Sequence, residues 1–110
     1  MKEFFDYVRK GELRISICGS CYKKVWPPSQ YCTSCLSKTK LKKLKGRGIL
    51  LEFTTSYIEN LQEVLGIVDM SGIRVLGSIS GQSLYHGIEV KLTKCGISPN
   101  GTVFYHFKSL

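Results

Sequence analysis

Two cysteine pairs, Cys18-Gly19-Ser20-Cys21 and Cys32-Thr33-Ser34-Cys35, decide the fold of this 110-residue chain. Ten residues separate the pairs, and this spacing lets one chain present four thiolates to a single tetrahedral metal ion, normally zinc. Four thiolates fill the coordination shell and leave no position for water or substrate, which favours a structural metal over a catalytic one. The expected ligands are Cys18, Cys21, Cys32 and Cys35, and iron in a rubredoxin-like site is the alternative metal.

The segment around the cysteines is expected to fold with little apolar core of its own. Structural zinc contributes an apparent binding free energy of about 10–16 kcal/mol, which acts as folding energy. Before the first pair, apolar residues from Phe4 to Val8 recur at helical spacing and Gly11 offers a stop, which predicts a short amphipathic helix. Its apolar face could cover the protein's own core or dock on a partner. Alternation at residues 13–17 then predicts a strand that runs into Cys18.

Behind the cysteines, residues 46–110 carry the pattern of a small β-barrel. Runs of β-branched, aromatic or alternating apolar residues predict five strands, at 49–58, 65–70, 73–79, 88–94 and 103–107. Turn signals such as Ser71-Gly72 and Pro99-Asn100-Gly101 separate these strands. The OB-fold is the commonest five-stranded solution. We therefore expect a mainly β protein, with a helix and a zinc ribbon in residues 1–45 and an OB-fold in residues 46–110.

The formal net charge of +8 is unevenly distributed along the chain. Residues 1–50 hold twelve Lys/Arg against three Asp/Glu, whereas residues 51–110 hold four against five. The densest basic stretch, expected to be a connector, contains Lys38, Lys40, Lys42, Lys43, Lys45 and Arg47. Its simplest interpretation is a solvated strand or linker face. The alternative is a binding strip for a polyanion, such as nucleic acid or the phosphates of a nucleotide-like cofactor.

The sequence shows no targeting signal and no run long enough to span a bilayer. Residues 1–6 place acids among the first apolar positions, and apolar runs such as Ile49-Leu50-Leu51 are far too short. Cysteine pairs without a signal peptide favour metal thiolates in a reducing compartment over secreted disulfides. These features predict a cytoplasmic protein that does not bind membranes.

No catalytic constellation is recognisable in the sequence. Cys95 is interpreted as a small buried apolar residue, and neither His86 nor His106 can be placed beside it as a base. Phosphate-binding loops, nucleophile elbows and paired carboxylates at metal-ligand spacing are all lacking. A non-catalytic role is therefore expected. Trp26 and Tyr31 are expected to pack over the metal-binding turns, with an exposed aromatic anchor as the alternative.

Several motifs, taken in order, resemble one family. They are Phe4-Phe5 before Gly11-x-Leu13, cysteine pairs bracketing Pro27-Pro28, Gly46-Arg47-Gly48 leading into Phe53-Thr54, Gly66-Ile67-Val68-Asp69-Met70 with Gly72-Ile73-Arg74, Gly87-x-x-Val90 and Phe104-x-x-Phe107. Together they resemble the acyl-CoA-associated domain-of-unknown-function family, in which a rubredoxin-like zinc ribbon precedes an OB-fold. The resemblance covers nearly the whole chain.

The resemblance implies a function that residue spacing alone does not. Family members accompany thiolase-superfamily enzymes. One bridges an acetoacetyl-CoA thiolase and a 3-hydroxy-3-methylglutaryl-CoA (HMG-CoA) synthase at the start of the mevalonate pathway, and others support hydratases or aldolases of steroid side-chain breakdown. This chain would then be a non-catalytic scaffold that holds enzymes together. It could also contact coenzyme A, with Arg47 and Arg74 as candidates for its phosphates.

The chain departs from the family pattern at the metal-binding turns. Many members have glycine after the second cysteine of each pair, where a left-handed residue eases the turn. Tyr22 and Leu36 stand at these places here, which predicts turns of a different shape with intact ligands.

The rival interpretation is a nucleic-acid-binding module, because zinc ribbons and OB-folds both bind nucleic acids. The basic excess and six tyrosines permit it. Against it, the predicted strands of the barrel carry few basic residues interleaved with aromatic ones. Binding to single-stranded DNA or RNA that weakens steeply with salt would favour this interpretation.

Overall fold

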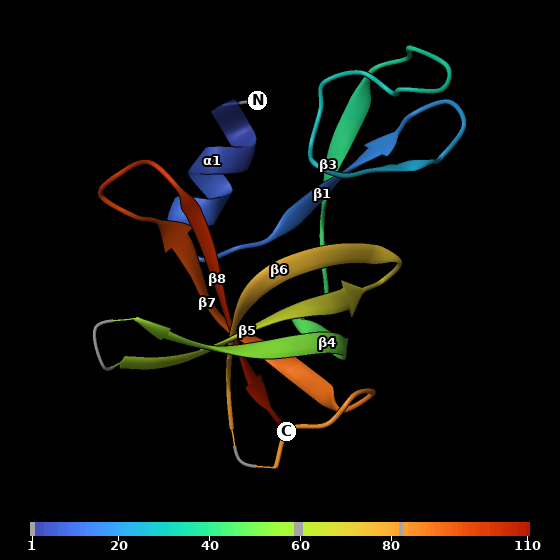
Figure 1. The fold of residues 1–110 in the computed structure, drawn as a ribbon. Coiled ribbons are helices and arrows are strands. Elements are labelled where there is room, and N and C mark those ends of the chain that lie inside the picture. The colour runs from blue at the N-terminus through green and yellow to red at the C-terminus, as the bar shows by residue number, and fades with distance from the viewer. Residues whose placement is uncertain (1, 59–60, 82) are drawn as a thin grey trace. The chain divides into compact units, whose positions relative to one another are not determined.

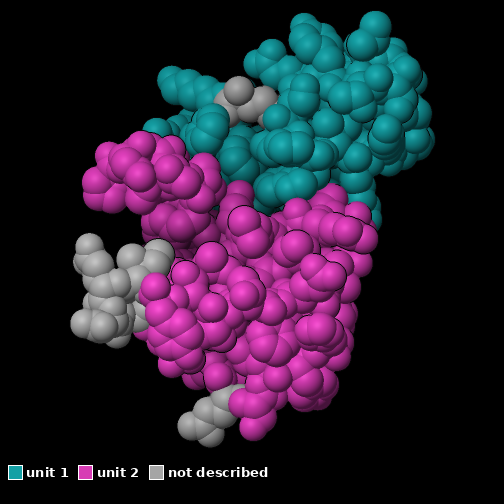
Figure 2. All heavy atoms as spheres, viewed as in Figure 1, with its two compact units in different colours: residues 1–44 teal, residues 45–110 magenta. Residues whose placement is uncertain are grey.

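A computed structural model describes residues 2–58, 61–81 and 83–110 of the chain. In these ranges the chain forms one helix and eight strands, so the protein is mainly β as predicted (Figure 1). The chain divides into two compact units, residues 1–44 and residues 45–110, which Figure 2 colours separately. None of the described helices is both long and apolar enough to cross a membrane.

Unit 1, residues 1–44, begins with helix α1 (Lys2–Arg9). Its buried residues are Phe4 and Val8, one helical turn apart, so this face of the helix covers the unit's own core. The Phe4 ring meets the Trp26 ring edge-on, with centroids 5.9 Å apart. Gly11 follows with a φ of 82°, a conformation that glycine adopts without steric cost. The predicted helix and its stop are therefore confirmed.

The remainder of unit 1 is a three-stranded antiparallel sheet in the order β2-β1-β3. The strands are β1 (Arg14–Cys18), β2 (Lys24–Val25) and β3 (Thr39–Lys43). Strand β3 lies where the sequence suggested a basic connector, and it pairs with β1 from Arg14↔Lys43 to Cys18↔Thr39. Thr39 and Leu41 are half-buried between exposed lysines, so the alternation that looked like a linker face belongs to an edge strand.

Ser16, in the central strand β1, is fully buried. It breaks the expected pattern, in which only every second residue of 13–17 would point inward. Its hydroxyl accepts a hydrogen bond from the Ser29 amide at 3.1 Å, which ties the proline-containing loop to the sheet. In that loop the Trp26–Pro27 peptide bond is cis.

Unit 2, residues 45–110, is a closed five-stranded barrel. Its strands are β4 (Arg47–Ile58), β5 (Leu61–Met70), β6 (Ile73–Ser80), β7 (Glu89–Ile97) and β8 (Val103–Ser109). The order around the barrel is β4-β5-β6-β8-β7; β6 and β8 run parallel, and the other neighbours are antiparallel. This is the predicted OB-fold.

The barrel core follows the period of two that strands impose. Strand β6 alternates buried and more exposed residues along its whole length, and Val75 in its middle is only 1% exposed. Leu50, Val68, Met70, Val90 and Phe107 complete a set of core residues that are at most 1% exposed. A register shift between Leu50 and Glu52 marks a β-bulge in the long strand β4.

Candidate metal centre

The four predicted ligands lie together in unit 1. Their sulfur atoms are all within 4.8 Å of one another. The Cys18 and Cys35 sulfurs are 3.2 Å apart, and the Cys21 sulfur is 3.7 Å from those of Cys32 and Cys35. Cys18 and Cys32, the first member of each pair, are buried, whereas Cys21 and Cys35 are exposed. Each pair thus contributes one inner and one outer thiol to a single cluster.

The two pairs have the same local geometry. In the first turn the amides of Ser20 and Cys21 point at the Cys18 sulfur, with N···S distances of 3.3 and 3.4 Å. In the second turn the Ser34 amide lies 3.4 Å from the Cys32 sulfur. Such N–H donors stabilise thiolate charge. The repeated geometry indicates two equivalent metal-binding turns, which we call knuckles: residues 18–22 and residues 32–36.

Both knuckles end in a left-handed residue that is not glycine. Tyr22 has a φ of 60° and Leu36 a φ of 62°. The Tyr22 amide donates to the Cys18 carbonyl at 3.2 Å, and the Leu36 amide donates to the Cys32 carbonyl at 3.0 Å. The expected change in turn shape is therefore wrong, because both side chains are accommodated in the left-handed turn.

The thiols differ in acidity. Hydrogen bonds from the Ser37 amide and hydroxyl hold the pKa of Cys35 at about 6. At Cys21 a hydrogen bond from the Lys23 amide lowers the pKa, but contacts with Cys18 and the other thiols, together with desolvation, outweigh it and raise the pKa to about 11. Without a cation, the neighbouring thiols therefore oppose ionisation of Cys21.

The donor set fits a zinc ion. Four cysteine sulfurs from two short turns match the tetrahedral thiolate sites of structural zinc. A divalent cation among them would offset the repulsion that keeps Cys21 protonated, and the amide donors would stabilise the remaining charge. Since all four donors come from protein side chains, such a site has no open position for a substrate.

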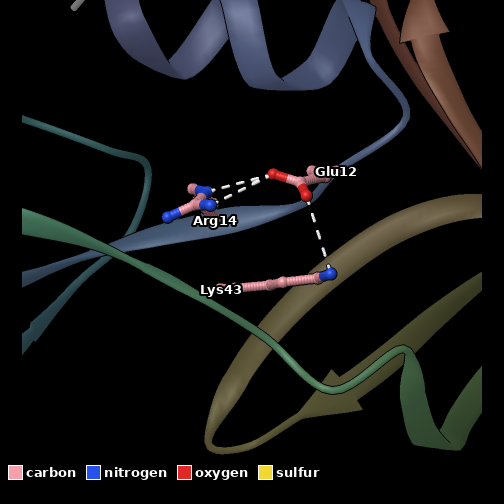
Figure 3. Close-up of polar contacts among 3 residues, drawn as sticks. All are labelled: Glu12, Arg14 and Lys43. Atoms are coloured by element: carbon pink, nitrogen blue, oxygen red, sulfur yellow. Dashed lines mark hydrogen bonds and ion pairs between the residues drawn. The ribbon is translucent and has the colours of Figure 1, made fainter.

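A charged cluster in unit 1 lies at the Arg14↔Lys43 end of the β1–β3 pair, opposite the end that leads into Cys18 (Figure 3). The Glu12 carboxylate lies 3.2 Å from the Arg14 guanidinium and 3.6 Å from the Lys43 ammonium. Arg14 also stacks on the Tyr7 ring, 3.8 Å from its centroid. The hydrogen bond from Arg14, together with the charges of Arg14 and Lys43, lowers the pKa of Glu12. Glu12 therefore partly neutralises one end of the basic strand β3.

The two arginines proposed for coenzyme A phosphates are not brought together. Arg47 lies on β4 and Arg74 on β6, and β5 runs between these strands. Arg47 lies 3.8 Å from the Glu89 carboxylate, and both line a shallow hollow with Asp69. Arg74 is exposed and stands opposite Asp69 in the β5–β6 register. The Glu89 carboxylate thus competes with phosphate for Arg47.

The remaining residues that were considered for a catalytic role, Cys95 and the two histidines, lie in the barrel unit. Cys95 is buried, as expected, and stands opposite Tyr105 in the β7–β8 register. Burial, followed by the charge of Cys95, raises the pKa of Tyr105 to about 12. His106 meets the Phe104 ring edge-on at 5.2 Å, and His86 meets Phe53 in the same way at 5.3 Å. Both histidines thus have aromatic neighbours.

Fold and site together define a class: a protein with a four-cysteine ribbon unit followed by an OB-fold barrel. Among solved structures, the chain is similar to one described as the Ltp2–ChsH2(DUF35) aldolase, with a TM-score of 0.82 and 18% identity over 98% of this chain and 92% of the other.

A second similar structure is a protein of unknown function from the DUF35 family of Sulfolobus solfataricus. Its TM-score is 0.72 at 16% identity, over 99% of this chain and 84% of the other. No family model matches the sequence, and no curated protein matches it. The structural likeness confirms, at the level of the fold, the resemblance that the motifs suggested.

Proposed function

We propose that this protein is a non-catalytic, zinc-binding accessory subunit of enzymes of acyl-CoA metabolism. The observation that carries the proposal is the likeness, over nearly the full length of both chains, to a DUF35 structure named with its aldolase partner. The OB-fold and the ribbon unit are both included in that match, so the likeness covers the elements of both units. The cytoplasm, whose reducing conditions keep thiols available for metal, is the proposed compartment.

In this proposal Cys18, Cys21, Cys32 and Cys35 bind one structural zinc ion. The closed shell of four thiolates assigns the metal to folding and not to chemistry. Metal analysis of protein purified without added zinc should find about one zinc ion per chain. A coloured, iron-loaded sample would contradict the zinc assignment.

The proposed partners are thiolase-superfamily enzymes, in particular an acetoacetyl-CoA thiolase and an HMG-CoA synthase of the mevalonate pathway. By bridging two such enzymes, the subunit would keep an acyl-CoA intermediate close to the next active site. The sequence motifs that resemble the acyl-CoA-associated family support this choice. Contact of Arg47 and Arg74 with coenzyme A stays a prediction, and the Glu89 carboxylate beside Arg47 opposes it at that position.

Affinity purification of the tagged protein from its native cells, followed by mass spectrometry, tests the proposal. We expect enzymes that act on acyl-CoA thioesters to be recovered in stoichiometric amounts. Recovery of thiolase and HMG-CoA synthase together would identify the mevalonate complex, and recovery of an aldolase or hydratase would assign another pathway. Recovery of ribosomal or other nucleic-acid-binding proteins alone would overturn the proposal in favour of the rival interpretation.

A further inference from the structure

The tips of the two knuckles expose large apolar side chains. Tyr22 is 77% exposed and Leu36 is 75% exposed, which makes them the two most exposed large apolar residues that the structure describes. Each directly follows the outer cysteine of its pair. An isolated exposed apolar residue is ordinary on a protein surface. Two at equivalent positions of a repeated turn call for a physical reason.

Both residues also have an unfavourable backbone conformation. With φ values of 60° and 62°, their Cβ atoms are crowded by the following carbonyl, a strain that glycine would avoid. Neither exposed side chain recovers this cost by burial in its own unit. Strained backbone that recurs at equivalent exposed positions is characteristic of residues kept for function and not for stability.

The knuckles lie next to each other. The sulfurs of Cys21 and Cys35, each adjacent in sequence to one tip residue, are 3.7 Å apart. The Lys23 ammonium donates a hydrogen bond to the Ser34 hydroxyl at 2.9 Å and so links the two turns directly. The two tips therefore belong to one end of unit 1 and can be covered by a single partner.

The charge of unit 1 indicates what kind of partner fits. The sequence has no acidic residue between Glu12 and Glu52, whereas lysines 23, 24 and 38 lie one or two residues beyond the ends of the knuckles. Residues 1–44 hold ten Lys/Arg against three Asp/Glu. A zinc ion with four thiolates adds two negative charges, so the unit stays positive when the metal is bound.

We propose that Tyr22 and Leu36 form an apolar docking pair that seats in an acid-rimmed hydrophobic hollow on the catalytic subunit. Apolar anchors supply the affinity at the centre of such an interface, and complementary charge at its rim steers association. This inference rests on the proposed function, because the partner is the acyl-CoA enzyme that the accessory subunit serves.

The test uses the enzyme that co-purifies with the full-length protein and compares its binding to Tyr22→Gly, Leu36→Gly and the double variant. Glycine removes the anchor and relieves the backbone strain at once. We expect the dissociation constant to rise at least about tenfold for each single variant and further for the double one. Zinc content should stay unchanged, and the thermal midpoint should stay equal or rise. Tyr57→Ala, at a barrel residue that is 73% exposed, is the matched control and should bind normally.

The outcomes separate the docking pair from the function on which it rests. Recovery of an acyl-CoA enzyme that binds all variants equally would overturn the docking pair alone. Loss of zinc or a lower thermal midpoint in the glycine variants would assign the two side chains a structural role and also overturn it. If no acyl-CoA enzyme co-purifies with the unaltered protein, both the proposed function and the proposed docking pair are overturned.

Discussion

Each knuckle holds one cysteine in its interior, and these inner thiols are the residues on which unit 1 depends. Cys18 and Cys32 are fully buried and form a small apolar cluster with Val25. Replacing Cys18 with serine should abolish stable zinc binding and unfold the ribbon, because a structural metal supplies about 10–16 kcal/mol of apparent binding energy. Metal content and backbone amide dispersion of the variant measure this. Cys95→Ser in the barrel is the matched control and should retain its zinc, since Cys95 belongs to the other unit.

The Glu12 carboxylate should make a pH-dependent contribution to the stability of unit 1. Because Arg14 and Lys43 lower its pKa below the ordinary value of 4.5, the carboxylate stabilises the folded state above that pH. The contribution is lost as the pH falls through the lowered pKa. Glu12→Gln should therefore lower the thermal midpoint at neutral pH, and the difference should shrink in about 1 M salt, where charges are screened. A carboxyl NMR titration that placed the midpoint of Glu12 above 4.5 would contradict this account.

At the scale of elements, strand β6 has a glycine, Gly77, in its middle and not in a turn. The close approach of β8 leaves no room for a side chain there. A Cβ atom on Gly77, in β6, would lie 2.6 Å from the Tyr105 carbonyl and 2.8 Å from the Phe107 ring. Gly77→Ala should cost about 1–3 kcal/mol, because overpacking displaces backbone and core together. Gly46→Ala is the matched control, since its Cβ would meet its nearest neighbours at 3.8 Å. Denaturant unfolding of both variants measures the difference; equal stability would contradict it.

How far the sequence predicts the elements depends on how local their determinants are. The cysteine spacing predicts the cluster and the alternating runs predict the barrel strands, because both are short-range patterns. The sequence does not decide strand β3, because its lysines suit a linker as well as an edge strand. Its pairing with β1 is a long-range contact that no local pattern encodes. The left-handed Tyr22 and Leu36 were missed for a related reason: the metal-binding turn as a whole, not the intrinsic preference of the residue, determines their φ.

The candidate site was predictable to the same extent. Its four ligands follow from spacing alone, whereas two other contacts of unit 1 do not: the Glu12–Arg14–Lys43 cluster and the Ser29–Ser16 hydrogen bond. The only sequence signal for the first is that Glu12 is the last acid before a long basic stretch. For the second there is no signal, because a serine in an alternating strand looks like a solvent-facing residue.

For the whole molecule, the two units should differ in what holds them together. Besides its cysteines, unit 1 has few fully buried apolar side chains among the described residues. In the barrel the apolar side chains that are at most 1% exposed include those of Leu50, Val68, Met70, Val75, Val90 and Phe107. Removing zinc with a chelator under reducing conditions should therefore unfold unit 1 and leave the barrel folded.

Amide NMR spectra recorded before and after chelation resolve both units in one sample. Retained dispersion for β4–β8 with collapsed signals for β1–β3 is the expected result. Loss of both sets at the same chelator concentration would show that the metal also stabilises the barrel. In the expected case zinc would control docking alone: a metal-free protein would keep its OB-fold and lose the knuckle tips that we propose as the contact with the enzyme.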